Sequence, residues 1–213
     1  MKIGVIGSGN IGATAARLFA AAGHEVAISN SRGPETLEGL VEEIGPGVRA
    51  ATVEEAAEFG EVVMEAIPFG RYTSLPAERL AGKVFITASN YYPARDGELD
   101  LGGRASSELV AGHLPGARVV KAFNTIYFAR LRDNGLPEAP VEEREVIFVS
   151  GDDGEAKGVV SGLIEEIGFA PVDVGTLAES RRQEPGSPVY NVATPVTGRP
   201  FRVFELACAP AAR

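Results

Sequence analysis

Short apolar runs recur along most of the chain, and each run is bounded by glycine, proline or polar residues. Such runs are typical of buried strands, because they are too short for a helix. The predicted strands are residues 2–6, 25–29, 48–51, 61–67, 83–88, 117–123, 145–150 and 169–174. Pro171 lies within the last run, which therefore predicts an edge strand.

Segments with a helical pattern separate these runs. Pro34 stands at the first turn of one segment, and residues 52–55 have the capping-box pattern that opens another. The predicted helices are residues 13–22, 34–44, 53–59, 76–80, 106–113, 125–132 and 155–167. The alternation predicts an α/β fold with a Rossmann-type, doubly wound and mostly parallel sheet, covered by helices on both faces.

The first predicted strand leads into a glycine-rich turn, Gly7-Ser8-Gly9-Asn10-Ile11-Gly12, which opens the first helix. Gly7 permits the tight turn, Gly9 lets a pyrophosphate approach the backbone, and Gly12 lets the helix pack closely on the strand. The N-terminus of the helix offers free N–H groups and a positive dipole end to phosphates. The alternative is a glycine-rich turn that binds nothing, but its place between a strand and a helix favours a dinucleotide site.

The end of the second strand bears on the choice of dinucleotide. An NAD site usually has Asp or Glu there for the ribose 2′-hydroxyl, but this chain has Asn30-Ser31-Arg32 and no carboxylate before Glu35. A serine hydroxyl and an arginine can bind a 2′-phosphate by charge-assisted hydrogen bonds. The sequence therefore predicts NADP(H), although Arg32 could also be a solvated loop charge. Residues 1–175 are accordingly predicted as an NADP-binding Rossmann domain. From about Gly175 the pattern weakens, and residues 176–213 are a small C-terminal extension of unpredicted structure.

Ligands of open α/β sheets bind beyond the carboxyl ends of the strands. Four segments follow buried strands there: residues 8–11, 67–70, 89–91 and 123–125. Together they are predicted to line the cofactor groove, with Ile67, Pro68, Asn90 and Asn124 as its members near the nicotinamide. The alternative reading is that the prolines merely end strands and the asparagines cap helices.

The sequence offers no histidine for acid–base catalysis. His24 and His113 both stand before strands, at the opposite edge of the sheet, so neither is placed for catalysis or metal binding. A hydride passing directly from a nicotinamide to a flavin-like ring needs alignment rather than a protein acid. Tyr91, Tyr92 and Tyr127 could donate a proton, but we expect them to form an apolar wall for a planar ring.

Composition limits the function classes. The 213 residues suffice for one domain with a small appendage, and the net charge of −9 argues against a nucleic-acid partner. No apolar run approaches a membrane span, and the chain opens directly on a strand rather than on a signal peptide. Cys208 is the single cysteine, which excludes an intramolecular disulfide. We therefore expect a cytoplasmic protein with a small-molecule partner.

Six stretches carry a resemblance to a known family: Gly7-Ser8-Gly9-Asn10-Ile11-Gly12, Asn30-Ser31-Arg32, Ala66-Ile67-Pro68, Lys121-Ala122-Phe123-Asn124-Thr125-Ile126, Gly151-Asp152-Asp153 and Leu163-Ile164-Glu165-Glu166-Ile167-Gly168. Through them, residues 1–175 resemble the NADPH-dependent reductases of the deazaflavin coenzyme F-420 (written F420 below). The same N-terminal module occurs in ferric reductases of the STEAP type, which pass electrons from NADPH through a flavin.

The resemblance implies a hydride transfer between NADP(H) and a deazaflavin or flavin, and a protein that is often dimeric. It implies that Ser31 and Arg32 hold the 2′-phosphate, and that Ser8, Asn10 and Ile11 line the pyrophosphate turn. Ile67, Pro68, Asn90 and Asn124 would border the nicotinamide. Archaeal members tend to have histidine in the position of Asn124, so the acceptor side departs from the family pattern.

Two other readings stay open at this point. One is an NADP-linked dehydrogenase of small metabolites, although such enzymes carry a helical C-terminal domain and only about forty weakly patterned residues follow Gly175 here. The other is a non-enzymatic NADP(H) sensor, which the missing catalytic side chain fits equally well. The sequence does not identify the acceptor or the oligomeric state.

Overall fold

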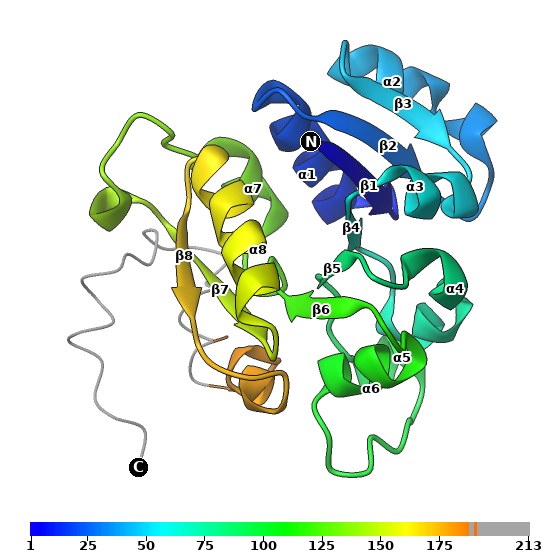
Figure 1. Ribbon diagram of the computed structural model, residues 1–213, viewed down its shortest axis with the longest axis vertical. Helices are drawn as coiled ribbons and strands as arrows, with labels where there is room; N and C mark the ends of the chain where they lie inside the picture. Colours follow the sequence, from blue (N-terminus) through cyan, green and yellow to red (C-terminus); the bar gives the residue numbers. More distant parts are fainter. Residues whose placement is uncertain (188–189, 191–213) are drawn as a thin grey trace.

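The computed structural model describes residues 1–187 and residue 190. Its centre is an eight-stranded sheet with the order β3-β2-β1-β4-β5-β6-β7-β8 (Figure 1). The strands are β1 Lys2–Ile6, β2 Glu25–Ser29, β3 Val48–Ala51, β4 Val62–Glu65, β5 Val84–Thr87, β6 Arg118–Lys121, β7 Val146–Gly151 and β8 Ala170–Asp173. All neighbouring pairs are parallel except β6 and β7. This confirms the predicted Rossmann-type sheet and the edge position of the strand that contains Pro171.

Helices cover both faces of the sheet. The α-helices are α1 Asn10–Ala21, α2 Glu38–Ile44, α3 Val53–Phe59, α4 Ala77–Leu80, α5 Pro93–Asp96, α6 Ser106–His113, α7 Phe128–Asp133 and α8 Gly154–Glu166. Short 3₁₀ helices are η1 Pro34–Leu37, η2 Phe69–Ser74, η3 Val141–Glu143 and η4 Ala178–Gln183. In the part of the chain that the structure describes, no helix is long and apolar enough to cross a membrane.

The two largest apolar clusters of the core lie on opposite faces of the sheet. Alternate residues of β4 face opposite ways, so Met64 packs in the cluster with α1 and α8, whereas Val63 packs in the cluster with α6. By the same alternation Glu65 faces the α6 side. An ionisable residue thus occupies a position that the strand pattern reserves for the core.

Element boundaries depart from the sequence prediction where the chain turns toward the carboxyl edge of the sheet. The first helix begins at Asn10 rather than at residue 13, directly after the glycine turn. The predicted helix of residues 125–132 begins only at Phe128, because residues 123–126 form the turn that follows β6. Residues 34–44 form η1 followed by α2, rather than one continuous helix.

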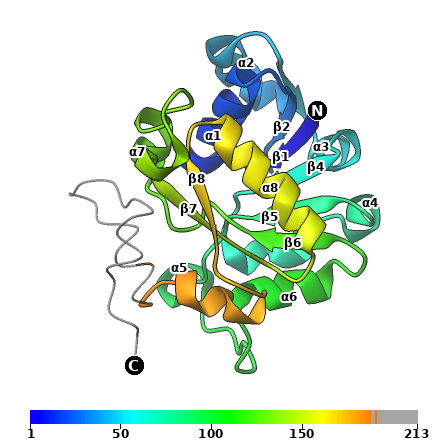
Figure 2. The ribbon, with the colours of Figure 1, turned by 60° about the vertical axis from the view of Figure 1, so that its left-hand side comes forward.

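The first part of the predicted extension packs against the sheet. Leu177 is buried in the α6-side cluster, and η4 contacts both α6 and β7 (Figure 2). Gln183 at the end of η4 is fully buried. The division of the chain at residue 175 stays a prediction, and Cys208 and the proline-rich residues 194–200 lie outside the described residues.

Candidate functional site

Two adjoining cavities lie beyond the carboxyl ends of β1, β4, β5 and β6. The first, of about 720 Å³, contains the glycine turn and the end of β2, and we name it the glycine-turn cavity. The second, of about 570 Å³, lies beyond β5 and β6, and we name it the strand-end cavity. Gly9, Ala66, Ile67 and Pro68 line both. An elongated ligand can therefore run from one cavity into the other across these residues.

The predicted residues lie in these two cavities with one exception. Gly7, Ser8, Asn30, Ser31 and Arg32 line the glycine-turn cavity, together with the four shared residues. Asn10, Ile11, Asn90 and Asn124 line the strand-end cavity. Gly12 is absent from both linings.

The three glycines differ in what surrounds them. Gly7 has a φ of +110°, which favours glycine, and a Cβ there would lie 2.6 Å from the carbonyl oxygen of Ala66. A Cβ on Gly12 would collide with the carbonyl oxygen of Gly7, so Gly12 permits close packing of α1 on the turn. A Cβ on Gly9 would meet nothing within 4 Å. Gly9 thus keeps open the space that a pyrophosphate would need.

The N-terminus of α1 adjoins this open space. Its cap residue, Gly9, makes no side-chain cap hydrogen bond, and no acidic residue stands in the first turn. The first N–H groups of a helix have no partner within the helix, and they carry the positive end of its dipole. The turn and the helix start therefore form a cradle suited to a phosphate.

Asn30 shapes the loop that displays Ser31 and Arg32. Its Oδ1 accepts a hydrogen bond from the Arg32 amide at 2.8 Å, and its Nδ2 donates to Thr36 Oγ1 at 2.9 Å. Nδ2 also reaches Ser8 Oγ at 3.4 Å, which joins the loop to the glycine turn. Asn30 thus acts on the cavity by ordering the loop as well as by lining it.

Arg71 is a lining residue that sequence reasoning missed. It belongs to η2, which follows β4, and it lines the glycine-turn cavity together with Arg32 from the other side of β1. Among the described residues, neither arginine side chain has an ion-pair partner, and Glu54 is the single carboxylate of the described lining. The spacing of three residues after Pro68 is the signal that could have identified Arg71.

Asn90 and Asn124 hold each other in the wall of the strand-end cavity. Asn124 Nδ2 donates to Asn90 Oδ1 at 2.9 Å, and Asn90 Nδ2 donates to the carbonyl oxygen of Asn124 at 2.7 Å. Asn124 Nδ2 donates also to the carbonyl oxygen of Gln183 at 2.6 Å, which uses its second N–H. Toward the cavity, Asn124 can therefore only accept, whereas Asn90 keeps one N–H to donate.

Gln183 completes this arrangement from far along the sequence. Its Nε2 donates to Asn124 Oδ1 at 3.1 Å and to the carbonyl oxygen of Lys121 at 3.2 Å. Its Oε1 accepts from Ser150 Oγ at 3.3 Å. Because Gln183 lies in the weakly patterned region after Gly175, no local signal predicted its role.

Phe123 sets the direction of the turn that carries Asn124. Its φ of +64° lies in the left-handed region, where it is the single non-glycine residue of the described chain. The Phe123 ring packs edge-on against Phe19 of α1, with 6.2 Å between ring centroids, and also lines the strand-end cavity. The buried ring stabilises a backbone conformation that is otherwise unfavourable.

Aromatic residues form much of the outer wall of the strand-end cavity. Tyr92, Tyr127, Phe128 and Tyr190 line it, and the hydroxyls of Tyr92 and Tyr190 lie 2.6 Å apart. The expected aromatic wall is therefore present at Tyr92 and Tyr127. Tyr91 does not line this cavity, because its ring packs on Phe69 and its hydroxyl bonds the backbone of residues 97 and 99.

Arg95 brings a positive charge to the rim of this cavity. Its guanidinium lies over the Tyr92 ring, 5.0 Å from the centroid, and donates to the carbonyl oxygen of Asn90 at 2.6 Å. It also pairs with Asp96, and the hydrogen bond from Arg95 lowers the pKa of Asp96 to about 2. The pair fixes Arg95 beside the cavity wall.

Both histidines lie away from the cavities, as the sequence predicts. His24 Nε2 lies 2.7 Å from Glu166 Oε2, and His113 Nε2 lies 3.0 Å from the carbonyl oxygen of Leu75. The described residues contain no cluster of histidine, cysteine or acidic side chains that could hold a metal ion.

Comparison with known proteins agrees with this geometry. Residues 2–91 match the family described as NADP oxidoreductase, coenzyme F420-dependent. The chain is 33% identical over 186 residues to the metalloreductase STEAP3 of Rattus norvegicus. The match covers 86% of this chain and 36% of that protein. The chain thus spans about a third of the length of the curated relatives it matches.

Two crystal structures are similar over most of their length. A hypothetical protein of Sinorhizobium meliloti is 38% identical, with a TM-score of 0.77 over 89% of this chain and 92% of that one. A protein of Arthrobacter sp. FB24, provisionally named an F420-dependent NADP-reductase, is 29% identical, with a TM-score of 0.71 over 85% and 87% of the two chains. The sheet, the glycine turn and these similarities together place the chain in the family of coenzyme F420-dependent NADP oxidoreductases.

Proposed function

We propose that this protein is an NADPH-dependent reductase that passes a hydride to a deazaflavin of the F420 type, with a flavin as the alternative acceptor. The observation that carries the proposal is the pair of adjoining cavities. One combines a phosphate cradle with two arginines, and the other is bordered by asparagines and aromatic rings. This arrangement fits a dinucleotide at full length, with room for a planar ring beside its nicotinamide.

The residues fit the phosphates of NADP(H). Ser31 and Arg32 would hold the 2′-phosphate, because both stand on the loop that Asn30 orders at the end of β2. Gly7, Ser8, Gly9 and the start of α1 would hold the pyrophosphate. Arg71 would approach the pyrophosphate from the wall that follows β4.

The residues of the strand-end cavity fit the nicotinamide. Asn90 would donate its remaining N–H to the carboxamide, and the second lone pair of Asn124 Oδ1 would accept from it. Ile67 and Pro68 would support the ring through apolar contact. Bound NADPH supplies the hydride, and the contribution of these residues is to hold its ring in one orientation and to exclude water.

Aromatic side chains would guide the acceptor. Tyr92, Tyr127 and Phe128 offer apolar surface in the lining of the same cavity as Ile67 and Pro68. Offset packing of a planar ring on such side chains fixes its plane without a catalytic acid. Arg95 at the rim would favour an acceptor with anionic substituents.

Absorbance at 340 nm tests the proposal. NADPH is mixed with the protein and, in turn, with oxidised F420, FMN, FAD or no acceptor. We expect fast loss of NADPH with F420. Loss with a flavin alone would keep the reductase and change its acceptor. Tight NADPH binding without loss in any mixture would contradict the proposal and favour a small-metabolite dehydrogenase or an NADP(H) sensor.

A homodimer and a cytoplasmic location, both expected from the sequence, belong to the same proposal. Sedimentation at several protein concentrations would test the first. A monomer at all concentrations would contradict it.

A further inference from the structure

Glu65 is a buried carboxyl group for which the proposed hydride transfer has no use. It ends β4, is 1% exposed, and lies directly before the shared cavity residues Ala66 and Ile67. Thr87 Oγ1 lies 2.5 Å from its Oε1, and the Ile67 amide donates to its Oε2 at 3.0 Å. Glu65 therefore stands immediately behind the wall of the strand-end cavity.

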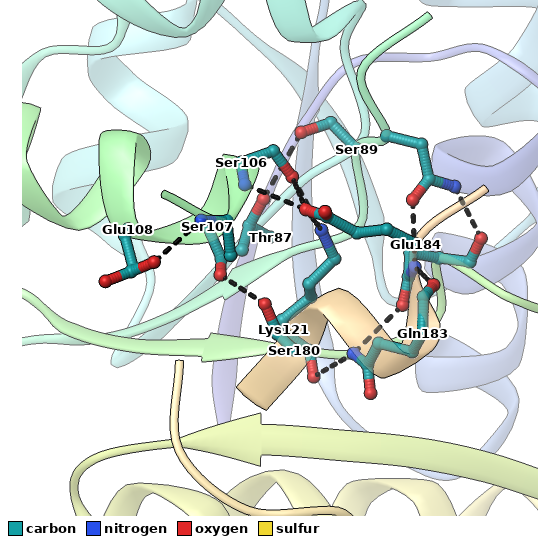
Figure 3. Close-up of polar contacts among 12 residues, drawn as sticks. Thr87, Ser89, Ser106, Ser107, Glu108, Lys121, Ser180, Gln183 and Glu184 are labelled. Atoms are coloured by element: carbon teal, nitrogen blue, oxygen red, sulfur yellow. Dashed lines mark hydrogen bonds and ion pairs between the residues drawn. The ribbon is translucent and has the colours of Figure 1, made fainter. Parts of the chain in front are cut away.

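The charges around Glu65 do not balance if every group is ionised. Lys121 on β6 is fully buried, and its Nζ lies 3.2 Å from Glu184 Oε1 and 2.7 Å from Ser106 Oγ (Figure 3). Glu184 also accepts from the Ser106 amide at 2.8 Å, so Lys121 and Glu184 form a complete pair. Arg95 also has an electrostatic interaction with Glu65, but its ion-pair partner is Asp96. Glu65 thus has no ion pair of its own within the described residues.

A buried carboxylate without an ion pair is costly and tends to take up a proton. Burial raises the pKa of Glu65, although hydrogen bonds from Thr87, Ile67 and Ser89 act in the opposite direction. Burial likewise lowers the pKa of Lys121, which the charge of Glu184 opposes. A protonated Glu65 leaves the group of Glu65, Lys121 and Glu184 with no net charge.

Hydroxyl groups connect Glu65 with the cavity. Thr87 Oγ1 contacts Glu65 on one side. On the other side it lies 3.3 Å from Ser89 Oγ (Figure 3). Ser89 lines the strand-end cavity. Each hydroxyl can accept one proton and donate another, so the two can pass a proton between Glu65 and the cavity.

We propose that Glu65 stores a proton, which it releases through Thr87 and Ser89 when positive charge forms in the strand-end cavity. The proposal rests on the proposed function, because that charge is the oxidised nicotinamide. When a hydride leaves the neutral reduced ring for the acceptor, the ring becomes a cation and the acceptor becomes an anion. The proton of Glu65 then neutralises the acceptor, and the carboxylate that remains on Glu65, behind the cavity wall, offsets the charge of the cationic ring. Solvent returns the proton after the oxidised cofactor leaves, so the sum is NADPH, acceptor and one proton giving NADP⁺ and the reduced acceptor.

Proton release on cofactor binding tests the proposal without any acceptor. Calorimetric titrations with NADP⁺ and with NADPH are made at neutral pH, in two buffers of different ionisation enthalpy. We expect the wild type to release up to one proton more with NADP⁺ than with NADPH. In Glu65→Gln this difference should vanish, whereas the exposed control Glu78→Gln should keep it. Equal release with both cofactors, or an unchanged difference in Glu65→Gln, would overturn the proposal. Failure of both cofactors to bind would instead refute the proposed function together with this inference.

Thermal unfolding of Glu65→Gln gives a second test, because the two charge states of Glu65 predict opposite results. If Glu65 is already neutral, glutamine replaces it with little change in Tm. If Glu65 is an ionised partner of Lys121, its removal leaves a buried charge, and the variant should be strongly destabilised or should not fold. The second outcome overturns the proposal even when no binding data can be collected.

The hydroxyl path has its own readout. Thr87→Val should keep the equilibrium proton release, because Glu65 is intact, but should slow the protonation of the reduced acceptor by about a hundredfold or more. The solvent deuterium isotope effect on that step should change with it. Unaltered rates and isotope effects in both Thr87→Val and Ser89→Ala would refute the path.

Discussion

The two cavities are built from the sequence in different ways. The glycine-turn cavity is lined by short continuous segments that follow β1, β2 and β4, together with the start of α3. These segments are ordered by local contacts, such as the hydrogen bond from the Arg32 amide to Asn30. The wall of the strand-end cavity depends on contacts such as Asn124 with Asn90 and Gln183, which are 34 and 59 residues apart. A substitution in the local motif should therefore change either cofactor affinity or stability, but not both. A substitution in the long-range network should change the orientation of the cofactor and the stability of the fold together.

The largest effect should come from Gly12, which lines neither cavity but permits close packing of α1 on the glycine turn. Gly12→Ala places a Cβ against the carbonyl oxygen of Gly7, so we expect a loss of about 3 kcal/mol or more in unfolding free energy, since backbone cannot yield as a side chain can. Gly9→Ala is the matched control, because its Cβ enters open space. It should keep the stability and weaken NADPH binding. Urea denaturation and binding titrations measure both, and equal stabilities of the two variants would contradict the packing role of Gly12.

Gln183 should show the coupling expected of the strand-end cavity. Gln183→Leu removes the hydrogen bonds to Asn124 and Ser150 and leaves buried polar groups unsatisfied, which costs about 1–3 kcal/mol for each such group. The unfolding free energy and the affinity for NADPH should fall together. Arg181→Gln, an exposed change on the same η4, serves as the control. If Gln183→Leu lowered the stability but left the affinity for NADPH unchanged, the positioning of Asn124 by Gln183 would be refuted.

Substitutions of Arg32 and Arg71 should show which part of the dinucleotide each arginine binds. Arg32→Gln should weaken NADPH by about 1.5–3 kcal/mol and leave NADH unaffected, because a charged hydrogen bond to the 2′-phosphate is lost. Arg71→Gln should weaken both cofactors, by about 1 kcal/mol at this exposed position. Dissociation constants for NADPH and NADH in the two variants measure the difference. A selective loss of NADPH in Arg71→Gln would place Arg71 at the 2′-phosphate instead.

The smallest effect should be the acid dependence of the Arg95–Asp96 pair. The hydrogen bond from Arg95 lowers the pKa of Asp96 to about 2 from its ordinary value of 3.8. A carboxyl group whose pKa is lowered by folding stabilises the fold above its unfolded pKa, and this contribution is lost as pH falls through the folded value. Between pH 3.8 and about 2, the wild type should therefore lose more stability than the variant Asp96→Asn loses over the same range. Tm is measured against pH for both proteins. If Tm falls equally with acidity in the two, the pair does not stabilise the fold.

The same contrast explains what could be read from the sequence. The sheet, most of its helices and the capping box at Thr52 follow local patterns, and the structure confirms them. The glycine turn and the loop at Arg32 were found because their spacing is fixed by the phosphates they are suited to hold. Gln183, Glu65 and the reversed direction of β7 were missed, since each depends on which distant segment lies beside it. Arg71 was missed for a different reason, because a single arginine three residues after Pro68 is a weak local signal.

Phe123 ties the durability of the fold to the shape of the strand-end cavity. A left-handed backbone costs a non-glycine residue about 1–3 kcal/mol, so glycine at this position would relax the chain. Glycine would also remove the buried ring that packs against Phe19 and lines the cavity, and the loss of a buried phenylalanine side chain costs about 3–5 kcal/mol. The cost exceeds the relief, so directed evolution for thermal tolerance alone should retain phenylalanine at this position. Laboratory selection for a more durable fold should therefore preserve this part of the cavity even when turnover is not selected.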